Sequence, residues 1–185
     1  MNKFKFTKTS IEGGVFIIEP TVFIDDRGYF MESYHKKEFE ENGLNIDFVQ
    51  DNQSKSTKGV LRGLHFQYNQ PQGKLVRVIK GEVFDVAVDL RKDSPTYSKY
   101  ESVILSEDNK KQFYIPPGFA HGFLVLSDEA EFTYKCTDFY NESDEGGITW
   151  NDPDINIEWP LNEDELILSE KDQKWKSLKN TSTNF

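Results

Sequence analysis

Short runs of alternating hydrophobic and polar residues dominate the chain, and glycine, proline, asparagine and aspartate separate them. Alternation with a period of two is typical of strands that bury one face. The pattern predicts strands over residues 15–18, 75–79, 83–90, 100–105, 123–126 and 131–139. Many short strands joined by turns at regular spacing indicate a β-sandwich or a β-barrel.

The clearest strand signal lies between residues 75 and 90, where two β-branched runs flank Lys80-Gly81. This arrangement predicts a hairpin with its turn at Gly81. Side chains of a strand point alternately to its two faces, so the second run has two distinct faces. One face carries Phe84, Val86, Val88 and Leu90, and the other carries Val83, Asp85, Ala87 and Asp89.

Helical signals are few. Residues 36–42 predict a short helix that ends at Gly43, a residue suited to a helix C-terminus. Residues 169–178 predict a second helix, with Ser169 as its N-cap and Asp172 three positions later. Residues 179–185 are expected to form a loose tail. A length of 185 residues suits a single domain spanning residues 1–185.

The net charge of −10 argues against a nucleic-acid-binding protein, which normally carries a basic face, and against binding to an anionic membrane. A few buried cations can still attract a small anionic ligand. Residues 1–10 lack the apolar core of a signal peptide, and no apolar run is long enough to span a bilayer. With Cys136 as the sole cysteine, no internal disulfide is possible, and we expect a cytoplasmic protein.

The chain has three histidines, and two of them lie in apolar, glycine-containing segments. His35 is in a charged stretch and is expected at the surface. His65 and His121 are expected on inner strands. One such histidine alone is more often a hydrogen-bonded core residue, but two of them, with Arg62 just before His65, favour a functional site.

Both histidine segments resemble the motifs of the cupin family. Metal-binding cupins carry His-x-His followed by Glu in the first motif, whereas this chain has Gln67 two residues after His65 and no glutamate directly afterwards. The second motif, Pro-x-Gly-x-x-His, is present and ends at His121. A divalent metal needs three or four converging ligands, so the sequence predicts a site without metal.

A closer resemblance covers nearly the whole chain. Eight segments, in order, resemble the dTDP-4-dehydrorhamnose 3,5-epimerase family: residues 23–30, 62–67, 74–78, 85–91, 115–123, 134–138, 150–153 and 168–172. The resemblance implies an all-β, cupin-type jelly-roll barrel with short C-terminal helices and no cofactor. It also implies a homodimer in which N-terminal strands pair with the partner, which would close an exposed sheet edge.

The resemblance implies epimerisation of dTDP-4-dehydro-6-deoxy-D-glucose at C3 and C5, giving dTDP-4-dehydro-L-rhamnose. Such chemistry needs a base on one face of the sugar, an acid on the other and stabilisation of the enolate oxygen. By similarity, His65 is the base, Asp172 orients it, Tyr134 is the acid and Lys74 holds the C4 oxygen. A nearby cation would make the phenol of Tyr134 a better acid.

Nine further positions match substrate-binding residues of the family. Cationic side chains suit a diphosphate, an aromatic ring suits stacking on thymine, and amides suit the edge of a pyrimidine or a ribose. Taken singly, Tyr134 could be a barrel-lining aromatic, Asp172 a first-turn helix charge, and several of the nine ordinary surface charges. The nine positions are Arg27, Glu32, Gln50, Asn52, Arg62, His121, Tyr140, Glu145 and Lys171.

Three alternatives stay open at this point. A relative of the family that inverts only one carbon, or that uses another nucleotide sugar, would carry the same motifs. A non-catalytic sugar-binding cupin would keep Arg62 and the aromatic residues without needing His65, Tyr134 and Asp172. A metal-dependent cupin oxygenase or isomerase is disfavoured by the small number of candidate ligands.

Overall fold

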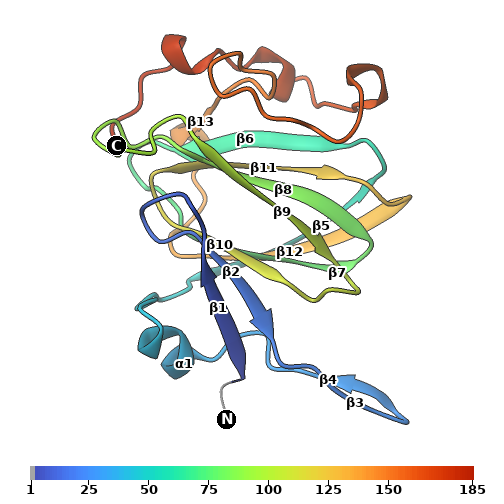
Figure 1. Cartoon of the computed structure of the whole chain (residues 1–185). Coiled ribbons are helices and arrows are strands. Elements are labelled where there is room, and N and C mark those ends of the chain that lie inside the picture. The colour runs from blue at the N-terminus through green and yellow to red at the C-terminus, as the bar shows by residue number, and fades with distance from the viewer. Residues whose placement is uncertain (1–2) are drawn as a thin grey trace.

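The computed structural model describes residues 3–185, in which two β-sheets lie face to face (Figure 1). The six-stranded sheet has the order β1 (Phe4–Lys8), β2 (Phe16–Pro20), β10 (Gln112–Ile115), β7 (Lys74–Lys80), β12 (Glu129–Cys136) and β5 (Gln50–Thr57). The five-stranded sheet has the order β13 (Glu145–Gly147), β6 (Leu61–Gln67), β11 (Phe119–Val125), β8 (Glu82–Asp89) and β9 (Tyr100–Ser106). The predicted all-β, cupin-type fold is confirmed, although the hydrogen bonding of the described strands leaves two sheets and no closed barrel.

The remaining elements are short. A small hairpin of β3 (Phe23–Asp25) and β4 (Gly28–Phe30) projects from the body of the molecule (Figure 1). The only α-helix among residues 3–185 is α1 (Lys36–Glu41). The chain after β13 crosses the outer face of the five-stranded sheet. It contains the 3-10 turns η2 (Glu163–Glu165), η3 (Asp172–Lys174) and η4 (Leu178–Asn180), while η1 (Glu142–Asp144) precedes β13.

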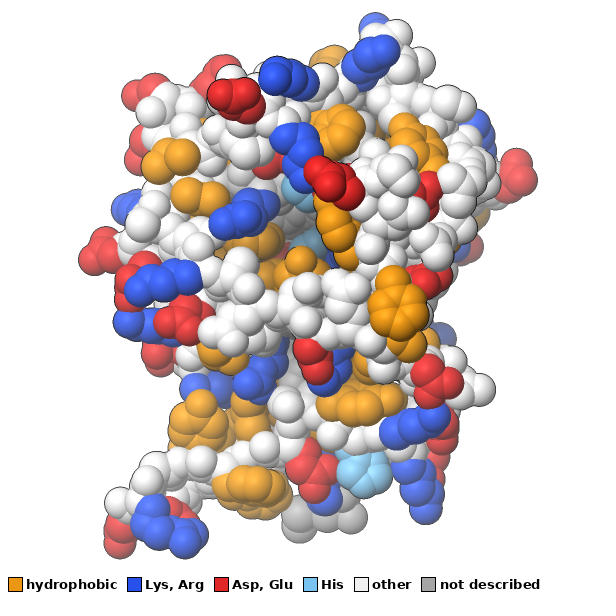
Figure 2. All heavy atoms as spheres, turned by 180° about the vertical axis from the view of Figure 1, so that it is seen from behind, with side chains coloured by type: hydrophobic (Ala, Val, Ile, Leu, Met, Phe, Trp, Pro, Cys, Tyr) orange, Lys and Arg blue, Asp and Glu red, His pale blue; other side chains and the backbone are white. Residues whose placement is uncertain are grey.

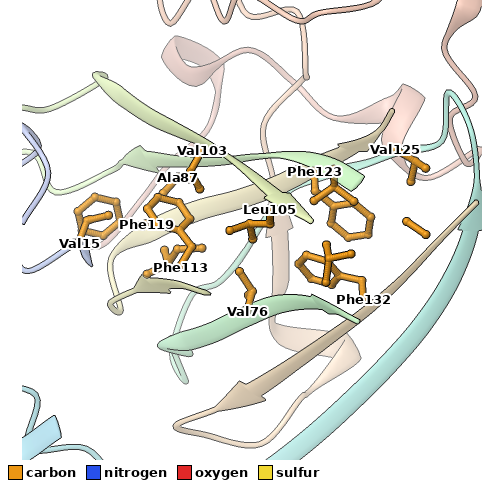
Figure 3. Close-up of a cluster of buried hydrophobic side chains, with 14 of the residues drawn as sticks. Val15, Val76, Ala87, Val103, Leu105, Phe113, Phe119, Phe123, Val125 and Phe132 are labelled. Carbon is orange, nitrogen blue, oxygen red and sulfur yellow. The ribbon is translucent and has the colours of Figure 1, made fainter. Parts of the chain in front are cut away.

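The main hydrophobic core fills the space between the sheets, where aliphatic and aromatic side chains from both sheets meet (Figure 3). The alternation along β8 explains how this strand serves two cores. Val83 and Ala87 pack in the core between the sheets, whereas Val86 and Val88 pack beneath the C-terminal segment. Asp85 therefore faces the interior between the sheets, on the same side of β8 as Val83 and Ala87.

Most predicted strands are present, with shifted ends. β11 begins at Phe119 and not at residue 123, so Gly122 lies within the strand and does not precede it. A Cβ atom at Gly122 would approach the carbonyl oxygen of Arg62 to 2.9 Å, so glycine permits the close contact with β6. β12 ends at Cys136 and not at residue 139. Residues 138–141, which follow it, lie in no helix or strand.

The predicted hairpin between residues 75 and 90 is wrong. β7 pairs with β10 and β12 in the six-stranded sheet, whereas β8 pairs with β11 and β9 in the other sheet. Gly81 has a φ of +78° and takes the chain from one sheet to the other. Alternation is the same in strands of one hairpin and in strands of two facing sheets, so the pattern alone could not distinguish the two arrangements.

The helix predictions had mixed outcomes. α1 forms as predicted, with Gly43 at a φ of +87° after its end. The predicted helix over residues 169–178 is wrong, because this segment contains only the single 3-10 turn η3. The predicted cap contact nevertheless forms, since the Asp172 backbone N–H donates to Ser169 Oγ at 3.1 Å.

The C-terminal residues pack against the body of the protein, unlike the loose tail that the sequence predicted. The Lys92 backbone N–H donates to the carbonyl oxygen of Phe185 at 3.1 Å, and Lys92 Nζ donates to that of Thr183 at 2.6 Å. The ring of Phe185 lies edge-on to Phe66 at 5.9 Å. Packing of the Phe185 ring thus holds this segment in place, although its other residues are mostly polar and are typical of a loose tail.

Crossing a bilayer takes a long, apolar helix, and the search for one over residues 3–185 returned none.

Candidate active site

His65 and His121 lie next to each other on adjacent strands of the five-stranded sheet. They are cross-strand partners in the pairing of β6 with β11. The facing sheet contributes Tyr134 from near the end of β12 and Lys74 from the start of β7. The two sheets thus place imidazoles on one wall and a phenol and an amine on the other.

These four side chains line two adjoining cavities, the larger with a volume of about 620 Å³. Seen from behind, histidine side chains lie at the base of a hollow whose rim carries acidic, basic and hydrophobic groups (Figure 2). A mostly pre-formed cavity with a few converging polar groups is the usual form of a small-molecule site. The side chains shared by both cavities are His65, Lys74, His121, Tyr134, Tyr140 and Glu145.

Asp172 reaches His65 from the C-terminal segment, 107 residues away along the chain. Asp172 Oδ1 lies 2.5 Å from His65 Nε2, which leaves the other ring nitrogen of His65 for a ligand. The carboxylate also accepts from Ser169 Oγ at 2.9 Å and from Trp175 Nε1 at 3.3 Å. Burial favours the neutral acid, but these hydrogen bonds outweigh it and hold the pKa of Asp172 below its ordinary value.

A second histidine–aspartate pair lies deeper in the protein. His121 Nε2 is 2.9 Å and 3.1 Å from the two carboxylate oxygens of Asp85 on β8. Burial lowers the pKa of His121 and raises that of Asp85, so both shifts favour the neutral forms. The sequence analysis did not identify Asp85 as functional. Its position on the inward face of β8, between Val83 and Ala87, was the available signal.

Tyr134 and Lys74 share the opposite wall, and Lys74 Nζ lies 5.9 Å from the centre of the Tyr134 ring. Burial lowers the pKa of the Lys74 ammonium. Burial also raises the pKa of Tyr134, and the opposing effect of Arg62 is smaller. The expected acidifying effect of a cation on Tyr134 is therefore present, but desolvation outweighs it.

The rim of the cavity joins the C-terminal segment to β13. Lys171 Nζ pairs with Glu145 at 2.7 Å, and the Tyr140 hydroxyl donates to the same carboxylate at 3.3 Å. The ion pair raises the pKa of Lys171 despite the opposing effect of burial. On the facing sheet, Gln50 Nε2 donates to Asn52 Oδ1 at 3.0 Å.

Arg62 lines the larger cavity, where its Nε donates to Ser56 Oγ at 3.1 Å. Eleven of the thirteen side chains predicted from the resemblance thus line one or both cavities. They are His65, Tyr134, Asp172, Lys74, Gln50, Asn52, Arg62, His121, Tyr140, Glu145 and Lys171.

Arg27 and Glu32 are the two predicted site residues that line neither cavity. Arg27 lies in the projecting hairpin of β3 and β4, where its side chain is 89% exposed and pairs with Asp25. Glu32 follows this hairpin and pairs with Lys3. Within the described chain, the structure therefore does not bring these two residues to the cavity.

Among residues 3–185, no group of three or more His, Cys, Asp or Glu side chains is arranged to hold a metal ion. Gln67, at the position of the second histidine of metal-binding cupins, uses its amide for hydrogen bonds to Gln70 and Phe139.

Residues 8–180 match the family model described as dTDP-4-dehydrorhamnose 3,5-epimerase. A curated relative of that name from Methanothermobacter thermautotrophicus is 59% identical over 180 residues, which cover 97% of each chain. A similar crystal structure is dTDP-6-deoxy-D-glucose-3,5-epimerase from Legionella pneumophila, in complex with dTDP-4-keto-L-rhamnose. It has a TM-score of 0.93 and 52% identity, and the match covers 97% of this chain and 95% of that one.

A more distant structural relative is ChmJ, a 3'-monoepimerase from Streptomyces bikiniensis in complex with dTDP-quinovose. It has a TM-score of 0.85 and 32% identity, and the match covers 92% of this chain and 86% of that one. The greater identity is thus with relatives named as double epimerases. The extent of these matches shows that the chain belongs to the dTDP-4-dehydrorhamnose 3,5-epimerase family.

Proposed function

We propose that this protein is an isomerase that inverts C3 and C5 of dTDP-4-dehydro-6-deoxy-D-glucose to give dTDP-4-dehydro-L-rhamnose, a step in dTDP-rhamnose biosynthesis. The observation that carries the proposal is that His65 and Tyr134 line one cavity from opposite sheets. Inversion next to a ketone needs a proton removed from one face of the ring and returned to the other.

In the proposed mechanism, His65 takes the proton from the carbon next to the ketone. The electron pair of the broken C–H bond moves to the C4 oxygen, which becomes an enolate. The short contact with Asp172 orients the imidazole and stabilises the imidazolium that forms, as a carboxylate does for histidine in other enzymes. The depressed pKa of Asp172 supports this role, because the carboxylate stays ionised while His65 gains its proton.

Lys74 and Tyr134 complete the proposed reaction from the facing sheet. Lys74 stabilises the negative charge on the C4 oxygen, and a buried cation does this more strongly than an exposed one. Tyr134 donates the proton that returns to the opposite face of the carbon. The phenolate so formed regains a proton, and His65 releases one, before the second carbon reacts. Their shared position beside each other at the cavity wall supports these roles.

We assign the cationic and amide groups around the cavity to the nucleotide. Arg62, His121 and Lys171 are assigned to anionic and polar groups of the substrate, and Tyr140 to stacking on thymine. Gln50 and Asn52 supply amide groups, and Glu145 holds Lys171 and the Tyr140 hydroxyl until substrate enters. No cofactor is required, because the ketone of the substrate already acidifies the neighbouring C–H bonds.

We further propose a homodimer in which Arg27 and Glu32 serve the cavity of the partner. The hairpin that carries Arg27 projects into solvent and exposes large hydrophobic side chains, at Phe23, Ile24, Tyr29 and Phe30. A contiguous exposed patch of this kind is typical of a protein–protein interface. Mixing inactive His65→Ala with inactive Arg27→Ala protein tests the idea, because a mixed dimer contains one complete site. Recovery of activity on mixing is expected, and its absence would contradict action across the interface.

Proton NMR of the substrate with enzyme in heavy water tests the activity itself. Loss of the C3 and C5 proton signals, with formation of the L-rhamno product, is the expected result. Exchange at one carbon only would indicate a monoepimerase like the Streptomyces relative. Binding without any exchange would indicate a non-catalytic sugar-binding cupin, and would reject the proposed function.

A further inference from the structure

The segment Asp138–Asn141 carries Tyr140 and forms no helix or strand. Each of its four residues has one main-chain group bonded to a glutamine side chain. The carbonyl oxygen of Asp138 accepts from Gln72 Nε2 at 2.8 Å, and that of Phe139 accepts from Gln67 Nε2 at 3.1 Å. The Tyr140 N–H donates to Gln50 Oε1 at 2.9 Å, and the Asn141 N–H to Gln67 Oε1 at 2.8 Å.

We call Gln50, Gln67 and Gln72 the glutamine cradle. Regular secondary structure usually pairs the main-chain N–H and C=O groups of a segment. Here side-chain amides take the place of a neighbouring strand. The three glutamines come from β5, from the end of β6 and from the loop before β7, so the cradle fixes the segment to both sheets.

Gln67 holds the central position, because it bonds to the residues on both sides of Tyr140. It is only 4% exposed. One amide hydrogen goes to Phe139 and the other to the carbonyl oxygen of Gln70 at 2.7 Å, while its oxygen accepts from Asn141. An amide has two hydrogens to donate, so Gln67 has none left for a ligand. Its contacts point to positioning rather than to direct binding.

Gln67 also connects this segment to the catalytic strand. It lies two residues after His65 on β6, so the two side chains share one face. Tyr140 has a fixed main chain, but its side chain is 50% exposed and reaches only Glu145 through its hydroxyl. A ring on a rigid main chain costs less entropy to order when a flat ligand binds than one on a mobile loop.

We propose that Gln67 is a positioning residue that holds Tyr140 as the stacking surface for the nucleobase. The inference rests on the proposed function, in that it takes the ligand to be a nucleoside diphosphate sugar. It extends that function, because it gives a use to the residue at the position where metal-binding cupins have a ligand. One face of β6 thus carries the proposed base, His65, and two residues later Gln67, which holds the segment that carries Tyr140.

The test compares Gln67→Met with Gln53→Met, a control on β5 whose side-chain amide donates one exposed hydrogen bond, to Glu131. Calorimetry measures the dissociation constant for dTDP, and steady-state kinetics separates KM from kcat. Loss of base–aromatic stacking weakens nucleotide binding, so Gln67→Met should weaken dTDP binding about 10-fold. KM should rise in parallel, while kcat stays within about twofold, because uniform binding is lost. The control should match wild type.

A double-mutant cycle separates positioning from a general structural effect. If Gln67 acts through Tyr140, then Gln67→Met should cause no further loss of dTDP binding in the Tyr140→Ala background. Equal losses in both backgrounds would overturn the proposal, as would unchanged dTDP binding in the single variant.

A second variant, Gln67→Glu, keeps the test decisive if Gln67→Met does not fold. It is nearly isosteric and keeps the acceptor for Asn141, but it places a carboxylate against two carbonyl oxygens. The same loss of dTDP binding is expected, with a normal circular dichroism spectrum, and unchanged binding would overturn the proposal. If the wild-type protein fails to bind dTDP, both the proposed function and this inference are rejected. If the wild-type protein is active and Gln67→Glu binds dTDP as tightly as wild type, only this inference is rejected.

Discussion

The two histidine–aspartate pairs have the same chemical groups in different surroundings. His65 and Asp172 meet at the cavity, where the histidine side chain is 23% exposed and the carboxylate collects two more hydrogen bonds. His121 and Asp85 come from neighbouring strands of one sheet, and both are buried on the side that faces the other sheet. Hydrogen bonds keep Asp172 ionised, whereas burial drives Asp85 toward its neutral form. Hydrogen-bond donors and solvent access, and not residue identity, thus decide whether the aspartate of each pair is held in its charged or its neutral form.

The largest expected effect is on turnover, at the accessible pair. His65→Ala should lower kcat by about 10²–10⁴-fold, the usual contribution of a general base. Binding of dTDP should change little, because the imidazole acts on the sugar carbons. Steady-state kinetics and calorimetry check both values. Near-normal turnover in this variant would assign the base elsewhere.

Replacing Asp172 and Asp85 by asparagine, one at a time, should have different effects. Asp172→Asn should lower kcat by about 10²-fold or more, because the imidazolium loses its charged partner. Asp85→Asn should have the smaller effect on kcat and should instead lower the free energy of unfolding by about 1–3 kcal/mol. Kinetics and denaturant unfolding of both variants test this contrast. Equal profiles for the two would remove the distinction between the pairs.

Tyr134→Phe addresses the wall opposite the histidines. The variant keeps the aromatic ring but lacks the phenolic hydroxyl that donates the proton. Inversion of the sugar carbon should therefore slow, while His65 continues to exchange the C–H proton with solvent. A fall in inversion of about 10-fold or more relative to exchange is expected for loss of a general acid. NMR in heavy water reports both rates in one sample. A proportional fall in both would remove the acid role of Tyr134.

The smallest effect is on the pH dependence of stability, and its sign differs between the pairs. The folded pKa of Asp172 is depressed, so its stabilising contribution is present above about pH 3.9 and is lost as the pH falls through the folded pKa. The folded pKa of Asp85 is raised, so stability falls as the pH rises from about 3.9 toward that value. Unfolding of wild type and each asparagine variant between pH 3 and 7 gives the two slopes. Slopes of the same sign would contradict the comparison.

The sequence pattern gave ranges for six of the thirteen strands in residues 3–185, because alternation reports burial of one face directly. It gave no range for β1, β3, β4, β5, β6, β10 or β13. It could not predict which strands pair, and so the turn at Gly81 was assigned to a hairpin although it joins two sheets. The helix after Ser169 failed for a related reason. Its cap contact is local and forms, and the Gln173 N–H donates to the carbonyl oxygen of Ser169. Further along, the carbonyl oxygen of Lys176 accepts from the distant Thr149 N–H, so the helix does not continue.

The site was predictable mainly through the resemblance, because its members are distant along the chain. The pairing of His65 with Asp172 follows from no local pattern. Asp85 had a local signal, a charge on a buried face, whereas Gln67 had none beyond its place in a motif. Arg27 and Glu32 stay predictions that depend on a second copy of the chain.

The position of Asp172 has a consequence for synthesis of the protein. His65 is synthesised, and leaves the ribosome, 107 residues before Asp172. Every strand assigned in residues 3–185 ends by Gly147. A polypeptide that ends between Gly147 and Asp172 contains the residues of all these strands and both His65 and His121, but it lacks the carboxylate that contacts His65. Synthesis of the last segment therefore supplies the group that orients the imidazole, so full turnover requires the nearly complete chain.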